Sequence, residues 1–189
     1  MAIRWGILGA GSVAQRRVMP AMKAQENCAI QALMVRDLKR AELLAAQFAV
    51  PRAYQSVEAL INDPNVDAVY VSSPVHLHKD HVLAVARAGK HVLCEKPMAL
   101  SAEECQLMID ACERAGVHLQ VCFVLRGFPI YHQVKGILEA GTLGHVVELR
   151  AHLAKWTPFA HDAWRIDPAQ SGGGCSSMWV LTIWICFVF

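Results

Sequence analysis

The chain lacks several features that would place it in a function class at once. Its 189 residues contain no CxxC pair, no block of basic residues and no apolar run of the roughly 20 residues that span a bilayer. The 18 basic and 16 acidic residues are mixed along the chain, so nothing indicates a nucleic-acid partner. The apolar stretch at the N-terminus is too short for a signal peptide. These absences favour a cytoplasmic protein with no membrane or nucleic-acid partner.

The features of a metal site are missing as well. The seven cysteines lie mostly in apolar runs, which predicts free, buried thiols in a reducing compartment. His76, His78 and His81 lie within six residues of one another, but Asp80 is the only acidic residue beside them and no cysteine is near. Because this set offers no convincing ligand geometry, we predict no metal site.

What the sequence does contain is a regular alternation of strand-like and helix-like segments. Near-continuous apolar runs at 28–35 and 67–73 are typical of strands buried on both faces. Asp37, Ser56 and Ser101 are predicted to cap the helical segments that follow them, with Glu104 completing a capping box. Short loops between alternating elements predict an α/β fold with a doubly wound parallel sheet. Further strands are expected at 3–9, near 54, at 91–97 and at 118–124, and helices at 13–24, 38–48, 78–88 and 102–115.

The character of the chain changes after Arg126. Pro129–Ala140 has the composition of a helix, and His145–Trp156 alternates like a strand with one polar face, which belongs in a different, antiparallel-type sheet. We therefore predict a first domain at 1–124, the incomplete start of an α+β domain with an open sheet at 125–174, and an aberrant apolar tail at 175–189.

A glycine-rich loop follows the first predicted strand. The stretch from Gly9 to Ala14 fits GxGxxG/A and opens a helix. Gly9 permits a tight turn, Gly11 lets the backbone approach a pyrophosphate, and Ser12 and Val13 begin the helix whose free amides face the anion. The alternative is a glycine turn used only for packing. In a βαβ unit, this pattern predicts a dinucleotide-binding domain.

The end of the second strand indicates which dinucleotide is bound. An acidic residue there binds the ribose 2′-hydroxyl of NAD, whereas an arginine accommodates the 2′-phosphate of NADP. The chain has Val35 and Arg36 at this place, with Lys39 and Arg40 close behind. We predict NADP as the cofactor, with NAD as the second possibility. The alternative is that these cations form an ordinary solvated face.

A lysine turn follows the fifth predicted strand. Lys96 lies at the carboxyl end of a parallel strand, where open α/β sheets bind ligands. Glu95 can hold its ammonium group, and Pro97 fixes the turn. A lysine desolvated beside nicotinamide has a lowered pKa and can exchange a proton with a substrate hydroxyl. Taken alone, the tripeptide could equally be a surface turn.

Together these motifs resemble the Gfo/Idh/MocA oxidoreductases. The resemblance rests on the glycine loop, Val-Arg-Asp, Ser-Ser-Pro…His, Gly-Lys-His-Val-Leu-Cys-Glu-Lys-Pro and Trp-Arg-Ile-Asp-Pro…Ser-Gly-Gly-Gly, and it covers Ile3 to Gly174. It implies a Rossmann domain followed by a substrate and dimerisation domain. It also implies Lys96 as the catalytic residue and a cofactor cleft that includes Ser73, Pro74, His78 and Glu95, with Trp164 and Arg165 near nicotinamide and substrate. Val75 departs from the family pattern, which often has Asn there.

The function implied by the resemblance is NADP-dependent hydride transfer to or from a sugar, polyol or related hydroxy compound. The intact protein is expected to be a homo-oligomer assembled through its C-terminal sheet. Two alternatives remain open. One is a nucleotide-binding remnant without catalysis, and the other is the NAD-assisted glycoside hydrolase or lyase chemistry found in the same family.

The apolar tail does not fit this family, whose next motif is L-x-D-x-G-x-H-x-x-D. After Gly174 the chain has no charged residue. Read two bases later, the codons of Met178–Val180 force Val and Gly, and those of Trp184–Ile185 force Asp. With permitted synonymous codons the shifted frame reads LIDVGSHYLDLLCF, which contains the motif. We therefore expect a frameshift near Gly172–Gly174 and an inactive fragment. The alternative is a natural apolar tail that serves as a weak anchor or partner-binding segment.

Overall fold

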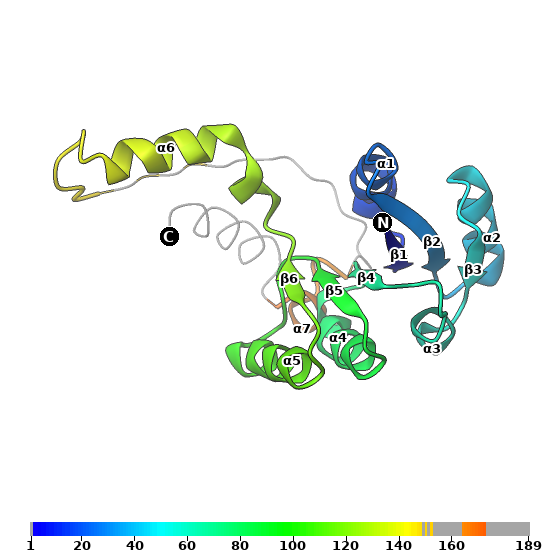
Figure 1. Ribbon diagram of the computed structural model, residues 1–189. Helices are drawn as coiled ribbons and strands as arrows, with labels where there is room; N and C mark the ends of the chain where they lie inside the picture. The colour runs from blue at the N-terminus through cyan, green and yellow to red at the C-terminus, as the bar shows by residue number, and fades with distance from the viewer. Residues whose placement is uncertain (1, 149, 151, 153–163, 173–189) are drawn as a thin grey trace. The chain divides into compact units, whose positions relative to one another are not determined.

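The protein is described by a computed structural model that covers residues 2–148, 150, 152 and 164–172 (Figure 1). The chain forms two compact units, Met1–Val121 and Cys122–Phe189, each of which is described by itself. The tail at 175–189 lies outside the described residues. The domain limits expected from the sequence remain a prediction.

The first unit alternates strands and helices as the sequence predicts. Its strands are β1 (Ile3–Leu8), β2 (Cys28–Met34), β3 (Arg52–Tyr54), β4 (Ala68–Val71), β5 (His91–Cys94) and β6 (Leu119–Val121). Its helical segments are η1 (Ala14–Val18), α1 (Met19–Lys23), α2 (Leu38–Gln47), α3 (Val57–Ile61), η2 (Val75–Leu77), α4 (His78–Arg87) and α5 (Ala102–Arg114).

The six strands form one parallel sheet in the order β3-β2-β1-β4-β5-β6. This order confirms the predicted doubly wound sheet and is that of a Rossmann fold. The winding direction reverses between β1 and β4, so a crevice opens at the carboxyl ends of these two neighbouring strands.

Helices cover both faces of the sheet, and each face has its own apolar core. Along β4, Val69 and Val71 point to the face covered by α3, α4 and α5, whereas Tyr70 points to the face covered by α1 and α2. Figure 1 shows α4 and α5 side by side on one face and α1 on the other. All four residues of β4 are buried, as expected of a central strand between two helical layers.

The predicted helix caps are present. The side chains of Asp37, Ser56 and Ser101 accept hydrogen bonds from backbone amides in the first turns of α2, α3 and α5. In a capping box, Glu104 would accept from the backbone N–H of the N-cap residue, Ser101. Here it accepts from the backbone N–H of the preceding residue, Leu100, at 3.1 Å. The same carboxylate pairs with the Lys79 ammonium at 3.0 Å, which ties α5 to α4.

The first helix contains a π-helical stretch that the sequence did not predict. Residues Ala14–Val18 adopt the wider winding, and the backbone N–H of Met19 donates to the Ala14 carbonyl. Pro20 follows and has no amide hydrogen to donate. A regular helix would lose the backbone hydrogen bond that residue 20 normally donates. The π-turn before Pro20 shifts the pattern of backbone hydrogen bonds by one residue at this place.

The described part of the second unit is helical. It contains η3 (Val124–Gly127), α6 (Pro129–Glu139), which confirms the predicted helix, and α7 (Pro168–Ser171). The predicted strand at 145–156 is wrong for its described residues 145–148, 150 and 152, which form no strand. An alternating segment becomes a strand only by pairing with a neighbour, and no strand is found in the described part of this unit.

The cysteines were predicted to be free, buried thiols. Of the five cysteines in the described part of the chain, Cys94 and Cys112 are buried, as predicted, whereas the other three are half-buried. Burial raises the pKa of the Cys112 thiol. Within the described ranges, no helix has both the length and the apolar character needed to cross a bilayer.

Candidate active site

The glycine loop begins directly at the end of β1. Gly9 has φ +83°, and a Cβ added there would lie 2.9 Å from the backbone nitrogen of Ser73. The Gly9 N–H donates to the Met34 carbonyl at the end of β2 at 3.0 Å. Both the positive φ and the close approach of β4 require glycine, so this residue fixes the fold of the loop.

Gly11 differs, because the protein itself does not require a glycine there. The nearest atom to an added Cβ would be the Gly9 carbonyl oxygen at 4.0 Å. The open space beside Gly11 is therefore a place that a bound group can approach and that a side chain would fill. Gln15 holds this loop, since its side-chain amide donates to the Ala10 carbonyl at 2.6 Å. These residues fit the pyrophosphate of a dinucleotide.

The helix start after the loop is open to solvent. Ser12 and Val13 are exposed, whereas Ala14 is fully buried against the sheet. Only a small side chain lets the helix approach β1 this closely, as the motif requires.

The end of β2 carries the exposed cations. Val35 is buried and Arg36 is exposed, while the Asp37 carboxylate accepts from the Arg40 backbone N–H at 3.2 Å. The side chains of Arg36, Lys39 and Arg40 make no ion pair with any residue that the structure describes. Their positive charge is available to an anionic ligand at this edge of the sheet.

Two serines follow β4. The Ser72 hydroxyl lies 3.2 Å from the Leu8 carbonyl oxygen and also contacts that of Gly9, so it joins the ends of β4 and β1. The sequence analysis missed this role. Ser73 is buried, and its hydroxyl lies 2.8 Å from His81 Nδ1. Pro74 is half-buried and begins the turn into η2.

His78 lies behind these loops and not on the surface of the crevice. Its ring is 1% exposed, and both ring nitrogens face backbone carbonyls. Burial is the main cause that lowers the pKa of His78, and the carbonyls of Ser73 and Pro97 act in the opposite direction. The predicted cofactor contact of His78 remains a prediction, and the ring has almost no surface with which to make one.

The turn after β5 is held by a residue that the sequence analysis missed. The buried Tyr70 hydroxyl donates to Glu95 Oε1 at 2.6 Å. Glu95 Oε2 accepts from the backbone N–H of Lys96 at 3.2 Å, so its contact with the lysine runs through the main chain. The Lys96–Pro97 peptide bond is cis. A tyrosine inside an otherwise aliphatic buried strand was the available signal, because its hydroxyl needs a partner.

Trp164 and Arg165 belong to the second unit. The Arg165 guanidinium lies 4.5 Å from the centre of the Trp164 ring, a cation–π contact. Two residues further on, Asp167 caps α7 through the Ala169 N–H at 2.9 Å. Their predicted place beside nicotinamide and substrate remains a prediction.

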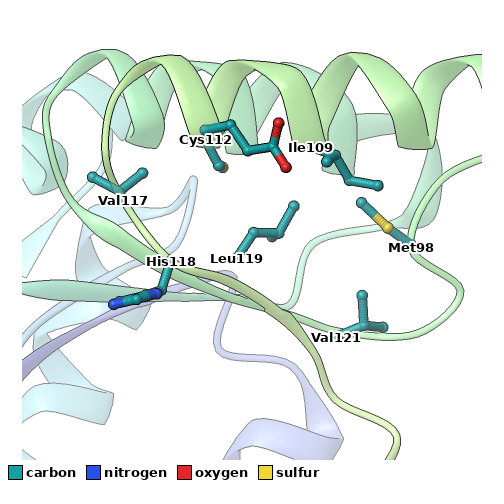
Figure 2. Close-up of a pocket in the computed structure, with 8 residues that line it drawn as sticks. Met98, Ile109, Cys112, Val117, His118, Leu119 and Val121 are labelled. Carbon is teal, nitrogen blue, oxygen red and sulfur yellow. The ribbon is translucent and has the colours of Figure 1, made fainter.

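A cavity of about 360 Å³ lies at the lateral edge of the sheet, away from the glycine loop (Figure 2). Figure 2 shows Met98 and Ile109 at one side of it and Val117 at the other, with Leu119 between them. Its walls are mainly apolar, and none of the predicted site residues lines it. The lining comes from Met98, α5 and the segment of β6, namely Met98, Ile109, Cys112, Glu113, Val117, His118, Leu119 and Val121.

Comparison with known families agrees with this geometry. The model of the Gfo/Idh/MocA oxidoreductase family, NAD-binding Rossmann fold, matches residues 3–123, and that of the Gfo/Idh/MocA C-terminal domain matches residues 131–180. A D-xylose 1-dehydrogenase (NADP(+)) from Haloferax volcanii is 41% identical over 169 residues, which are 89% of this chain and 51% of that protein. A 1,5-anhydro-D-fructose reductase from Ensifer adhaerens is 35% identical over 90% of this chain and 51% of its own length. The chain spans about half the length of these relatives.

Solved structures show the same likeness. An aldose–aldose oxidoreductase from Caulobacter crescentus, complexed with glycerol, superimposes with a TM-score of 0.82 at 30% identity, over 94% of this chain and 54% of that one. A 3-ketoreductase from Actinomadura kijaniata, in complex with TDP-benzene and NADP, gives a TM-score of 0.73 at 31% identity, over 77% of this chain and 45% of that one.

Proposed function

The chain belongs to the Gfo/Idh/MocA oxidoreductase family, and we propose that it is part of an NADP-dependent enzyme that transfers hydride to or from a sugar, polyol or related hydroxy compound. One observation carries the proposal. The glycine loop after β1, the serines after β4 and the Glu95–Lys96 turn after β5 meet at the carboxyl edge of neighbouring strands. Ligands bind in this crevice in open α/β sheets.

The residues of this edge have separable roles in the proposed reaction. Gly11 leaves room for the pyrophosphate, and the amides of the first helix turn stabilise its charge. Glu95, itself oriented by Tyr70, holds the main chain of Lys96. Lys96 acts as the general acid–base group: its ammonium form donates a proton to the substrate oxygen, and its neutral amine form accepts one from the substrate hydroxyl. NADP supplies the hydride chemistry when it is bound.

Cofactor choice depends on Arg36. It follows β2 directly, is exposed, and has no ion-pair partner among the described residues, as a 2′-phosphate site requires. Fluorescence titration with NADPH and NADH tests the preference. We expect tighter binding of NADPH, and Arg36→Ala should weaken NADPH about tenfold while leaving NADH unchanged.

Arg87→Ala is the matched control, because Arg87 is also exposed but lies at the last turn of α4. It should leave both affinities unchanged. Equal or tighter binding of NADH by the unaltered chain would refute the preference for NADP.

The substrate class rests on the relatives, whose names refer to xylose, anhydrofructose and aldoses. A panel of aldoses, polyols and inositols, assayed for NADP reduction by the protein with its reading frame restored, tests it. Cofactor binding without turnover of any of them would favour the non-catalytic remnant. Release of a glycoside product without net reduction would favour the hydrolase or lyase alternative.

We also propose that residues from Cys175 onward are a frameshift product and that the form with this tail is inactive. The support is the sequence alone, since the shifted frame contains the family motif. The nucleotide sequence tests it directly. A stop codon within a few codons of the shifted frame would refute it. Homo-oligomer formation and a cytoplasmic location belong to the same proposal for the intact enzyme.

A further inference from the structure

We propose that His78 is a positioning residue that holds the Lys96–Met98 turn against the turn after β4. The inference rests on the proposed function and deepens it, because it assigns the lysine turn a dedicated support. His78 itself contributes no atom to the crevice surface.

The contacts of the ring define this role. Nε2 lies 2.8 Å from the Ser73 carbonyl oxygen, and Nδ1 lies 3.0 Å from that of Pro97 and 3.3 Å from that of Met98. Carbonyl oxygens only accept, so a ring nitrogen forms such a bond only when it carries a hydrogen, and both nitrogens do so together only in the imidazolium form. In the neutral form, which the lowered pKa of His78 favours, one nitrogen donates and the other only contacts its carbonyl. The imidazole lies between two loops whose contacted carbonyls, of Ser73 and of Pro97 and Met98, are 24 and 25 positions apart in sequence.

Burial makes these bonds consequential. The ring is 1% exposed, so water cannot replace a lost partner, and an unpaired carbonyl in this place is costly. His78 also opens α4, whose buried residues Val82 and Val85 fix the helix on the sheet. The ring is thus carried by a rigid element, as a positioning group requires.

The lysine turn is held on both sides. On its N-terminal side, Tyr70 orients Glu95, which accepts from the Lys96 backbone N–H. On its C-terminal side, His78 binds the Pro97 and Met98 carbonyls. Without the imidazole, the C-terminal side would lose this donor and keep the long contact from Cys94 Sγ to the Met98 carbonyl at 3.9 Å. The main chain at Lys96 would then sample more than one orientation.

This arrangement predicts an effect confined to one half of the cofactor. The adenosine and pyrophosphate half is expected at Gly9–Val13 and Arg36, whereas the nicotinamide half is expected at the turns after β4 and β5. Loss of the imidazole should weaken NADP, which reaches both places. It should spare adenosine 2′,5′-bisphosphate, which lacks the nicotinamide half.

The test compares His78→Leu, which has no donor, with His78→Gln, which can donate to one side only. His76→Gln is the matched control, because His76 lies on the same loop and its Nδ1 has no hydrogen-bond partner among the described residues. Affinities for NADP and for adenosine 2′,5′-bisphosphate are measured by calorimetry. Amide hydrogen exchange of peptides covering 9–13 and 95–100 is measured alongside.

We expect His78→Leu to weaken NADP about tenfold, His78→Gln to weaken it less, and both to leave the bisphosphate within about twofold. Exchange should accelerate at 95–100 and not at 9–13. Equal loss of both ligands, or unchanged exchange at 95–100, would overturn the inference. If the unaltered chain binds neither ligand, the proposed function fails, and the exchange experiment still decides the role of His78. If His78→Leu does not fold, His78→Gln carries the same comparison.

Discussion

The parallel strands begin at one edge of the sheet, the amino edge, and end at the other, the carboxyl edge. The two edges differ in how their charged side chains are paired. At the amino edge, Asp63 and Asp67 each have an arginine partner. Asp63 is 3% exposed and accepts from Arg52 at 2.5 Å and from the Tyr54 hydroxyl at 3.2 Å. Asp67 accepts two side-chain hydrogen bonds from Arg4 at 2.6 and 2.9 Å. Burial raises the pKa of Asp63, but the hydrogen bonds from Arg52 and from Asn65 outweigh it, so that the pKa is lowered.

At the carboxyl edge, Lys79 pairs with Glu104 at 3.0 Å, but five other cations have no such partner among the described residues. Arg16, Arg17, Arg36, Lys39 and Arg40 are exposed and make no ion pair within the part of the chain that the structure describes. The loops there are held by neutral hydrogen bonds and by Tyr70 with Glu95. The difference indicates that the ion pairs at the amino edge stabilise the fold. The exposed cations without an ion pair at the carboxyl edge are available to bind an anionic ligand.

The largest effect is expected when one lysine at each edge is replaced by alanine. In the protein with its reading frame restored, Lys96→Ala should lower turnover roughly 10²–10⁴-fold, as expected when a general acid–base group is removed, with little change in melting temperature or NADPH affinity. Lys90→Ala should lower the melting temperature and leave turnover unchanged. The reason is that the Lys90 ammonium donates to the Val66 carbonyl at 2.6 Å at the amino edge. Steady-state kinetics and thermal melts separate the two. Normal turnover by Lys96→Ala would remove this residue from the mechanism.

The two glycines of the loop should separate folding from binding. Gly9→Ala introduces a side chain at φ +83° and 2.9 Å from a backbone atom, so it should lower stability and abolish binding together. Gly11→Ala meets no protein atom closer than 4.0 Å, so it should lower NADPH affinity at least about tenfold without changing the melting temperature.

Gly136→Ala is the control for both glycine variants, because an added Cβ there meets nothing within 4 Å. Unchanged NADPH binding by Gly11→Ala would contradict the assignment of the open space to the pyrophosphate.

At the amino edge, Asp63→Asn should destabilise the fold and leave the site intact. The amide would leave the donors of Arg52, Tyr54 or Asn65 without an acceptor, at a cost of about 1–3 kcal/mol. Urea unfolding measures the loss, and Asp80→Asn, on an exposed side chain, is the control. A changed NADPH affinity in the folded Asp63→Asn protein would break the separation between the edges.

The smallest effect is expected at Asp67, because it and Arg4 are both more than a third exposed. The hydrogen bond from Arg4 is the main cause that lowers the pKa of Asp67 from 3.8 to about 2. A carboxyl whose pKa is lower in the folded protein stabilises the fold above its unfolded pKa, and this contribution disappears as pH falls toward 2. Asp67→Asn should therefore be less stable than the unaltered chain at pH 7, and the difference should shrink as pH falls from about 4 and disappear below about 2. A constant difference in urea midpoint across this range would contradict the assignment.

The fold was predictable because the helix-capping residues and the apolar runs in the sequence indicated the same alternation of helices and strands. Asp37, Ser56 and Ser101 cap where they were expected to, and the apolar runs lie between two helical layers. The strand expected from 145 onward failed in its described residues, because alternation shows which face is polar but not whether a pairing strand is present.

The site was predictable only in part. Gly9 and Arg36 belong to a local motif whose geometry is set within one βαβ unit. The bonds from Tyr70 to Glu95 and from His78 to Pro97 join residues 25 and 19 positions apart, and they depend on the register between β4 and β5. No pattern within one segment of sequence contains that register. The resemblance implied that His78 belongs to the cofactor cleft, which remains a prediction, and the sequence did not indicate that its side chain is buried.

The central claim is that the dinucleotide binds at the carboxyl edge of the sheet, and backbone amide NMR during titration with NADPH tests it most directly. The account predicts chemical-shift changes at 9–13, at 72–78 and at 94–98, with none at Arg4, at 63–67 or at Lys90. Changes gathered at the amino edge or around the cavity beside α5, or none at saturating NADPH, would contradict it.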